Sequence, residues 1–168
     1  MQLGGSLICQ NYFRSPRPDY EIYEEDLALT EMYEDLGFDM VWSVEHHFTD
    51  CELIPDPLQM LSYVCGRTKK IGLGTFVIVH SWHDPVRVAE QIAMLDNFSR
   101  GRELLLGFGR GVGQVEYDGF RVSMSEARER LVESIEVVKL GLGQERFSFD
   151  GKYFKIPPRE VVPKPRQK

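Results

Sequence analysis

The sequence predicts an α/β protein with a parallel sheet, because segments typical of buried strands alternate with segments typical of helices. The continuous run Ile71–Val79 is rich in β-branched residues, as is typical of a strand buried on both faces. Asp84 and Pro85 then offer a helix N-cap and a first-turn proline. The strand–helix order recurs four times, which favours right-handed crossovers. Two closures remain open on these grounds: an open doubly wound sheet, or half of the eight units of a barrel.

The first half of the chain accounts for two strand–helix pairs. Apolar residues 3–10 predict a buried strand, and the polar residues after them predict a loop. Apolar side chains spaced among acids predict an amphipathic helix over residues 22–36, which Gly37 would end. A second strand is predicted at Phe38–Val44 and a second helix at Leu58–Cys65.

The second half continues the alternation and then changes. Its expected elements are a strand Ile71–Val79, a helix from Asp84 to about Phe98, a strand Glu103–Phe108, a helix Ser123–Leu140 and a hairpin Arg146–Ile156. Ser123 and Glu126 have the spacing of a capping box at the start of the last helix. Asp150 and Gly151 are typical of a tight hairpin turn.

Composition excludes several classes of protein. The 168 residues are 42% hydrophobic and carry a net charge of −6, which suits one folded domain. No apolar run approaches the roughly 20 residues of a membrane span, and no secretory signal opens the chain. Cys9, Cys51 and Cys65 have no disulfide-type or metal-type spacing, so we expect a reducing, cytoplasmic location. Residues 61–168 hold 18 bases but also 13 acids, mixed along the helices, so we expect no nucleic-acid partner.

Polar residues follow two of the predicted strands, at the end where α/β proteins carry their active sites. His46 and His47 follow the second strand, and His80 and His83 follow the third. Adjacent histidines on an extended chain point to opposite faces, so we expect no metal site. A single inward histidine acting as a general acid or base is the better interpretation.

Glycines mark the third and fourth predicted strands. Gly72 and Gly74 alternate, as do the glycines at 107, 109, 111 and 113, so each set shares one face of an extended chain. Such faces suit either a flat ring lying against the backbone or a tight barrel interior. The dinucleotide fingerprint and the phosphate-loop motif are both unmatched. Arg110 could bind a phosphate or form a surface ion pair.

Five blocks carry a family resemblance and keep one order and spacing over nearly the whole chain: Leu36–Phe48, Thr68–Thr75, Asp84–Arg87, Leu95–Arg102 and Gly107–Gly111. Together they resemble the bacterial-luciferase-like flavin-dependent monooxygenases. The resemblance implies a TIM (β/α)8 barrel, of which residues 1–168 would form about the first four units of a single domain. It implies reduced FMN at the strand ends, which with O2 forms a C4a-peroxyflavin that oxidises a small organic substrate, a long-chain aldehyde in luciferase.

The resemblance also implies roles for individual residues. His46 matches the family's catalytic histidine, a general acid/base, and His47 matches its functionally important neighbour. Arg110 matches a residue that contacts the FMN phosphate. Val77 matches a position whose backbone meets the flavin ring, and a cis peptide can precede it in the family, here Phe76–Val77.

Three further residues in the matching segments are expected at the cofactor: Thr75, Gly109 and Gly111. Gly109 stands where luciferase has a reactive cysteine, which argues against the light-emitting enzyme itself. A barrel needs eight strand–helix units, so we expect family members to be about twice as long as this chain, which stops where a fifth strand would begin. An F420-dependent oxidoreductase and a non-catalytic half-barrel therefore stay open. The family also implies a flavin reductase and self-association through residues 57–98, or a subunit partner.

Overall fold

The computed structural model describes residues 1–12, 16–49 and 52–167, so Cys51 lies outside the described residues. The chain forms two compact units. The first unit comprises residues 1–78 and 102–107. The second comprises residues 79–101 and 108–168.

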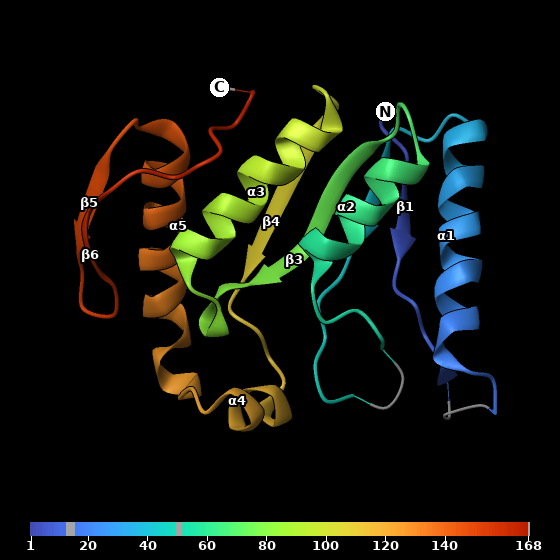
Figure 1. The fold of residues 1–168 in the computed structure, drawn as a ribbon. Coiled ribbons are helices and arrows are strands. Elements are labelled where there is room, and N and C mark those ends of the chain that lie inside the picture. Colours follow the sequence, from blue (N-terminus) through green and yellow to red (C-terminus); the bar gives the residue numbers. More distant parts are fainter. Residues whose placement is uncertain (13–15, 50–51, 168) are drawn as a thin grey trace. The chain divides into compact units, whose positions relative to one another are not determined.

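The first unit is built on strands that alternate with helices along the chain (Figure 1). In order these are β1 (Gly4–Leu7), α1 (Asp19–Asp35), β2 (Met40–Ser43), α2 (Pro57–Arg67), β3 (Gly72–Val79) and β4 (Leu104–Gly109). The sheet has the order β1-β2-β3-β4. The pairing is parallel, with Ser43 opposite both Leu7 and Thr75. The predicted α/β class with a parallel sheet is confirmed.

One face of this sheet carries buried apolar side chains, and on the other face a tryptophan covers two glycines. Leu7, Val41 and Leu73 are fully buried on the face that carries α1 and α2. On the other face, the indole of Trp42 fills the space over two glycines. A Cβ would lie 2.5 Å from Trp42 at Gly4 and 2.4 Å from it at Gly74. The glycine of β3 therefore makes room for a neighbouring side chain, as the packed-interior interpretation expects.

Residues that precede the strands are tied together by a glutamate on α1. The Glu34 carboxylate accepts backbone N–H bonds from Lys69, Lys70 and Ile71 at 2.6–3.0 Å, where the chain enters β3. Burial by itself raises the pKa of Glu34, but these three donors and Arg102 lower it below its usual value overall. The connection between α2 and β3 is therefore held by a charged acceptor.

The second unit is a helical pair with a hairpin beside it (Figure 1). Its elements are η2 (His80–Trp82), α3 (Pro85–Ser99), the end of β4, α4 (Gln114–Phe120), η3 (Met124–Glu126), α5 (Ala127–Gly143), β5 (Phe147–Asp150) and β6 (Lys155–Arg159). The start of α3 is confirmed, since the Asp84 carboxylate accepts N–H bonds from Val86 at 2.9 Å and Arg87 at 3.2 Å. The predicted hairpin is also confirmed, with antiparallel pairing of β5 and β6, but the predicted turn at Asp150 and Gly151 is wrong, since Asp150 pairs with Lys155 and the connection is residues 151–154.

Two further local predictions are wrong. The capping box at Ser123 and Glu126 does not form, because the Ser123 hydroxyl bonds to that of Ser125 instead and a 3-10 turn precedes α5. The first strand is shorter than residues 3–10, since β1 ends at Leu7. Helix α4 was not predicted from the sequence. Its N-cap is Gly113, which gives no side-chain cap, and its Tyr117 is fully buried. Tertiary packing therefore stabilises this short helix.

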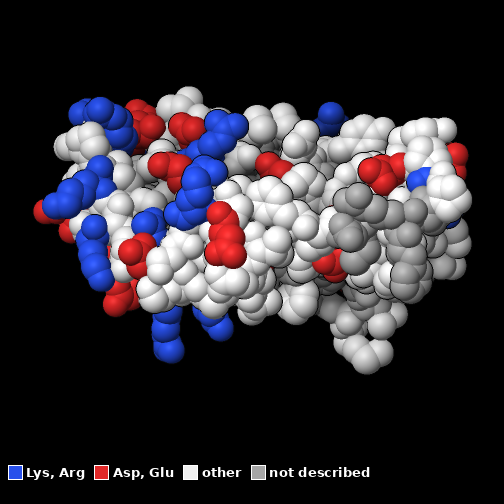
Figure 2. Space-filling view, turned by 90° about the horizontal axis from the view of Figure 1, so that it is seen from below, with Lys and Arg blue, Asp and Glu red and all other residues white. Residues whose placement is uncertain are grey.

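The surface agrees with the mixed charge of the sequence. Figure 2 shows lysine and arginine side chains interspersed with acidic ones on the side that carries α5 and the hairpin. The Lys152 ammonium lies 2.7 Å from the Glu129 carboxylate and is one such pairing. No helix in the described part of the chain has the length and apolar character that crossing a membrane requires.

Candidate functional site

Four of the seven predicted site residues belong to the first unit. His46 and His47 follow β2, and Thr75 and Val77 lie within β3. Because β2 and β3 are parallel neighbours with Ser43 opposite Thr75, their carboxyl ends meet at one edge of the sheet. The structure therefore brings these four residues to the same edge of the sheet.

His46 is paired with a carboxylate that the sequence pattern did not indicate. Its Nδ1 lies 3.3 Å from Oε2 of Glu52, and the two side chains are 36% and 21% exposed. Glu52 is six residues further along the chain, in the loop that leads to α2. No local motif relates two residues at this spacing, so only the folded loop reveals the pair.

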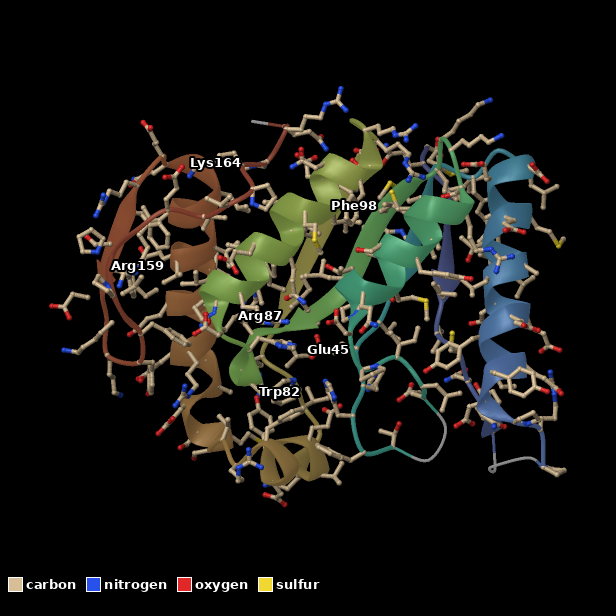
Figure 3. The ribbon with its side chains drawn as sticks, in the orientation of Figure 1. Glu45, Trp82, Arg87, Phe98, Arg159 and Lys164 are labelled. Atoms are coloured by element: carbon tan, nitrogen blue, oxygen red, sulfur yellow. The ribbon has the colours of Figure 1, made fainter. Side chains whose placement is uncertain are left out.

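His47 is paired with a different glutamate. Its Nε2 lies 3.0 Å from Oε1 of Glu45, whose side chain is fully buried. Glu45, labelled in Figure 3, comes two residues after the end of β2. A buried carboxylate requires a charged or hydrogen-bonded partner, and His47 supplies one. The two neighbouring histidines therefore differ in partner, in the bonded nitrogen and in burial.

The start of the chain holds the loop that carries these histidines. Cys9 lies just beyond β1 in the left-handed region, with φ of 52°. Its N–H donates to Oδ2 of Asp26 at 2.7 Å, and its carbonyl accepts the N–H of Leu53 at 3.1 Å. Burial, reinforced by Asp26, raises the pKa of the Cys9 thiol far above its usual range. This thiol is therefore a structural group rather than a nucleophile.

The end of β3 presents backbone and apolar surface. The Thr75 hydroxyl donates to the carbonyl of Gly107 at 3.0 Å, which ties β3 to β4 within the first unit. A Cβ at Gly107 would lie 2.5 Å from the carbonyl oxygen of Thr75, so the strands approach closely there. The Phe76–Val77 peptide bond is cis, as the resemblance implies. The Phe76 side chain is 72% exposed.

The other three predicted residues, Gly109, Arg110 and Gly111, belong to the second unit. The carbonyl of Arg110 accepts hydrogen bonds from the hydroxyls of Ser81 and Tyr117, while its side chain is exposed. Gly111 has φ of 79°, which disfavours any other residue. The backbone around Arg110 is therefore fixed while its guanidinium faces solvent.

Aromatic packing supports the same segment of the second unit. A Cβ on Gly111 would lie 2.7 Å from the indole of Trp82, labelled in Figure 3. The Trp82 ring stacks on Phe120 of α4, with centroids 5.1 Å apart and an interplanar angle of 15°. Short helix α4 thus holds the chain that follows β4, a role that no sequence signal predicted.

The first unit also contains an apolar pocket of about 360 Å³ between α1, α2 and the loop before α2. Tyr23, Met60 and Tyr63 are among its lining residues. Within the described part of the chain, none of the seven predicted site residues lines it. The predicted site is therefore not this pocket but the strand ends.

Comparison with known proteins decides the family. Residues 6–168 match the model of the luciferase-like monooxygenases. The chain belongs to the luciferase-like monooxygenase family. It is 30% identical to the alkanal monooxygenase alpha chain of the Kryptophanaron alfredi symbiont, over 97% of this chain and 45% of that one. It is 29% identical to the oxygenase component of the flavin-dependent trigonelline monooxygenase of Acinetobacter baylyi, over 88% and 41%.

Solved structures show the same architecture. The monooxygenase RslO1 from Streptomyces bottropensis matches with a TM-score of 0.94 and 31% identity, over 100% of this chain and 51% of that one. At 21% identity, fold similarity alone extends to two proteins solved with a flavin or deazaflavin. One is the oxygenating constituent of 3,6-diketocamphane monooxygenase from Pseudomonas putida with FMN, with a TM-score of 0.82 over 92% and 42%. The other is an F420-dependent secondary alcohol dehydrogenase with an F420-acetone adduct, with a TM-score of 0.80 over 99% and 50%.

The predicted fold class is confirmed by these matches, which extend over about half of each barrel protein. The chain spans about half the length or less of the curated relatives that it matches. The activity, substrates and partners of those whole proteins therefore do not transfer directly to this chain.

Proposed function

We propose that this chain provides the catalytic histidine and part of the flavin site of a monooxygenase that uses reduced FMN and O2 to oxidise a small, aldehyde-like organic substrate. The observation that carries the proposal is His46, which follows β2 in a chain of this family and has a carboxylate partner at 3.3 Å. Active sites in such folds lie at the carboxyl ends of the strands. A carboxylate-paired imidazole is a suitable general acid/base at neutral pH.

The residues present fit a flavin mononucleotide. Its phosphate requires charged donors, and Arg110 has an exposed guanidinium on a fixed backbone. Its ring requires a flat apolar surface, and Phe76 and Val77 offer one at the end of β3. The Thr75 hydroxyl holds that strand against Gly107, where a Cβ would lie 2.5 Å from the carbonyl oxygen of Thr75. Gly109 and Gly111 are proposed to lie at the cofactor on the family resemblance alone.

Reduced FMN, when bound, supplies the electrons that activate O2 for transfer of one oxygen atom to the substrate. In this proposal His46 holds or gives up one proton at its imidazole during that transfer. His47 is kept in place by the buried Glu45 carboxylate and lines the same edge. In the second unit, Arg110 is proposed to bind the phosphate.

Two alternatives keep a specific basis. An F420-dependent oxidoreductase has the same fold, as the secondary alcohol dehydrogenase illustrates. A half-barrel without catalysis would suit a chain that covers only part of its relatives. A functional partner is proposed on the names of the relatives, one an alpha chain and one an oxygenase component. We propose a subunit partner or a second copy, a separate flavin reductase and a cytoplasmic location.

The test is product formation. The purified chain is mixed with photoreduced FMN, O2 and a long-chain aldehyde, and the carboxylic acid is measured by mass spectrometry. We expect acid from the wild-type chain and a loss of roughly 100-fold or more in His46→Gln, the range of a general acid/base. Acid formation that is equal in the variant would rule out the role of His46. No acid, with reduction of F420 by an alcohol instead, would favour the deazaflavin alternative.

A further inference from the structure

The backbone of Glu52 is fixed by several hydrogen bonds, although Glu52 lies in a loop. Its backbone pairs with Gln10 beyond β1, and its N–H and carbonyl both bond to the hydroxyl of Thr49. The next residue, Leu53, donates its N–H to the carbonyl of Cys9 at 3.1 Å. These bonds fix where the Glu52 side chain begins.

The imidazole that Glu52 meets is anchored by the same loop. The N–H of His46 donates to the carbonyl of Ile54 at 2.9 Å, two residues after Glu52. The loop thus folds back on itself, and both ends of the His46–Glu52 pair are set by the backbone. The carboxylate meets Nδ1 of His46 rather than its other nitrogen.

Stability does not account for this arrangement. The two side chains are 36% and 21% exposed, and partly exposed ion pairs contribute about 0–1 kcal/mol. The effect of the carboxylate on the imidazole tautomer is larger than its effect on the stability of the fold. A carboxylate acceptor at Nδ1 favours the tautomer with hydrogen on Nδ1, which leaves the lone pair on Nε2. It also sets the plane of the ring.

We propose that Glu52 is the positioning residue of His46, which holds the ring and selects the tautomer that accepts a proton at Nε2. This inference rests on the proposed role of His46 as general acid/base. It adds a second residue that acts through His46. Glu45 meets His47 at Nε2, so by the same reasoning His47 would carry its hydrogen on Nε2.

The test measures the tautomer directly, without FMN or turnover. Two-dimensional ¹⁵N NMR of the purified chain above the titration of its histidines reports the ratio of Nδ1–H to Nε2–H at His46. We expect Nδ1–H to predominate in the wild-type chain, and Glu52→Gln to lower the ratio about tenfold, as loss of one charge-assisted bond predicts. Glu52→Asp should restore part of it. Glu31→Gln is the matched control, since Glu31 is paired with Arg67 in an exposed ion pair of the same unit.

A ratio that is equal in the wild-type chain, Glu52→Gln and Glu31→Gln, with circular dichroism unchanged, would overturn the proposal and leave Glu52 as a surface ion pair. Turnover then separates the two claims. If Glu52→Gln shifts the tautomer and lowers kcat about tenfold with KM unchanged, both hold. If it shifts the tautomer while His46→Gln oxidises substrate normally, Glu52 positions His46 but the proposed function fails.

Discussion

The connection that enters β3 and the loop that follows β2 are held in different ways. Before β3, one carboxylate, Glu34, accepts three backbone N–H groups, and the Arg102 guanidinium bonds to Thr68 and to the carbonyl of Cys65. After β2, each carboxylate meets a histidine side chain instead, Glu52 at His46 and Glu45 at His47.

The difference separates stability from chemistry. A carboxylate that satisfies backbone donors stabilises a connection. A carboxylate that meets an imidazole orients a group that can accept or donate a proton. In α/β barrels the amino ends of strands serve stability and the carboxyl ends serve function. The proposed function assigns this division to β2 and β3, whereas after β1 the Asp26 carboxylate accepts the backbone N–H of Cys9.

The largest expected effect is at Arg110, directly after β4. Arg110→Ala should weaken FMN binding about 10- to 100-fold, because one charge-assisted contact to phosphate is lost. Its free energy of unfolding should stay within about 0.5 kcal/mol of the wild type, as for other exposed positions. Flavin fluorescence and urea unfolding measure the two quantities. Arg128→Ala, an exposed arginine of α5, is the control, and equal weakening in both variants would contradict a specific phosphate contact.

At Glu34, before β3, we expect a loss of stability without a loss of FMN binding. Glu34→Ala should lower the free energy of unfolding by about 1–3 kcal/mol, since three backbone N–H groups lose their acceptor. FMN affinity of the folded variant should not change. Urea unfolding followed by circular dichroism tests this, with Glu31→Ala on the same helix as control. A Glu34 variant as stable as the control would break the proposed division of roles.

Lowering the pH should remove the stabilising contribution of Glu34 in the wild-type chain. The lowered pKa of Glu34 means that its contribution to stability is present above the usual value of 4.5 and is lost as the pH falls through the lower, folded-state pKa. The free energy of unfolding should therefore fall with pH below about 4.5, and less steeply in Glu34→Gln. Parallel pH profiles for the two proteins would argue against this assignment.

The smallest effect tests whether every polar residue after a strand is reactive. Cys9 follows β1, yet the raised pKa of its thiol keeps it protonated at neutral pH. Iodoacetamide at pH 8 should leave Cys9 unmodified in the folded chain and label it in urea, as peptide mapping by mass spectrometry would report. Labelling of Cys9 without denaturant would show that the reagent reaches the chain after β1 in the folded protein, which would contradict the burial of Cys9.

Local signals predicted most of the fold. The β-branched run Ile71–Val79 and the cap at Asp84 predicted β3 and the start of α3 to within a residue. Helix α4 was missed because its support is the packing of Tyr117 and Phe120 around Trp82, which is tertiary. The capping box failed because the Ser123 hydroxyl has a nearer partner in Ser125.

Local sequence also predicted where the candidate site residues lie relative to the strands. His46 and His47 stand in a local motif after a strand, so the sequence alone located them. Glu52 pairs with His46 only because the loop folds back through bonds to Gln10 and Cys9, which no periodicity encodes. Glu45 directly precedes the two histidines in the sequence, but its burial is a property of the fold that the sequence pattern does not show.

The most direct test of the central claim, that the residues after the strands bind a flavin, is a titration of the purified chain with FMN. Flavin fluorescence should change and saturate, with a single site per chain and a dissociation constant below about 1 mM. Glu34→Gln should give the same curve as the wild type, while Arg110→Ala should move it to higher FMN concentration. A fluorescence signal that does not change with the wild-type chain, or that shifts equally in both variants, would contradict the account.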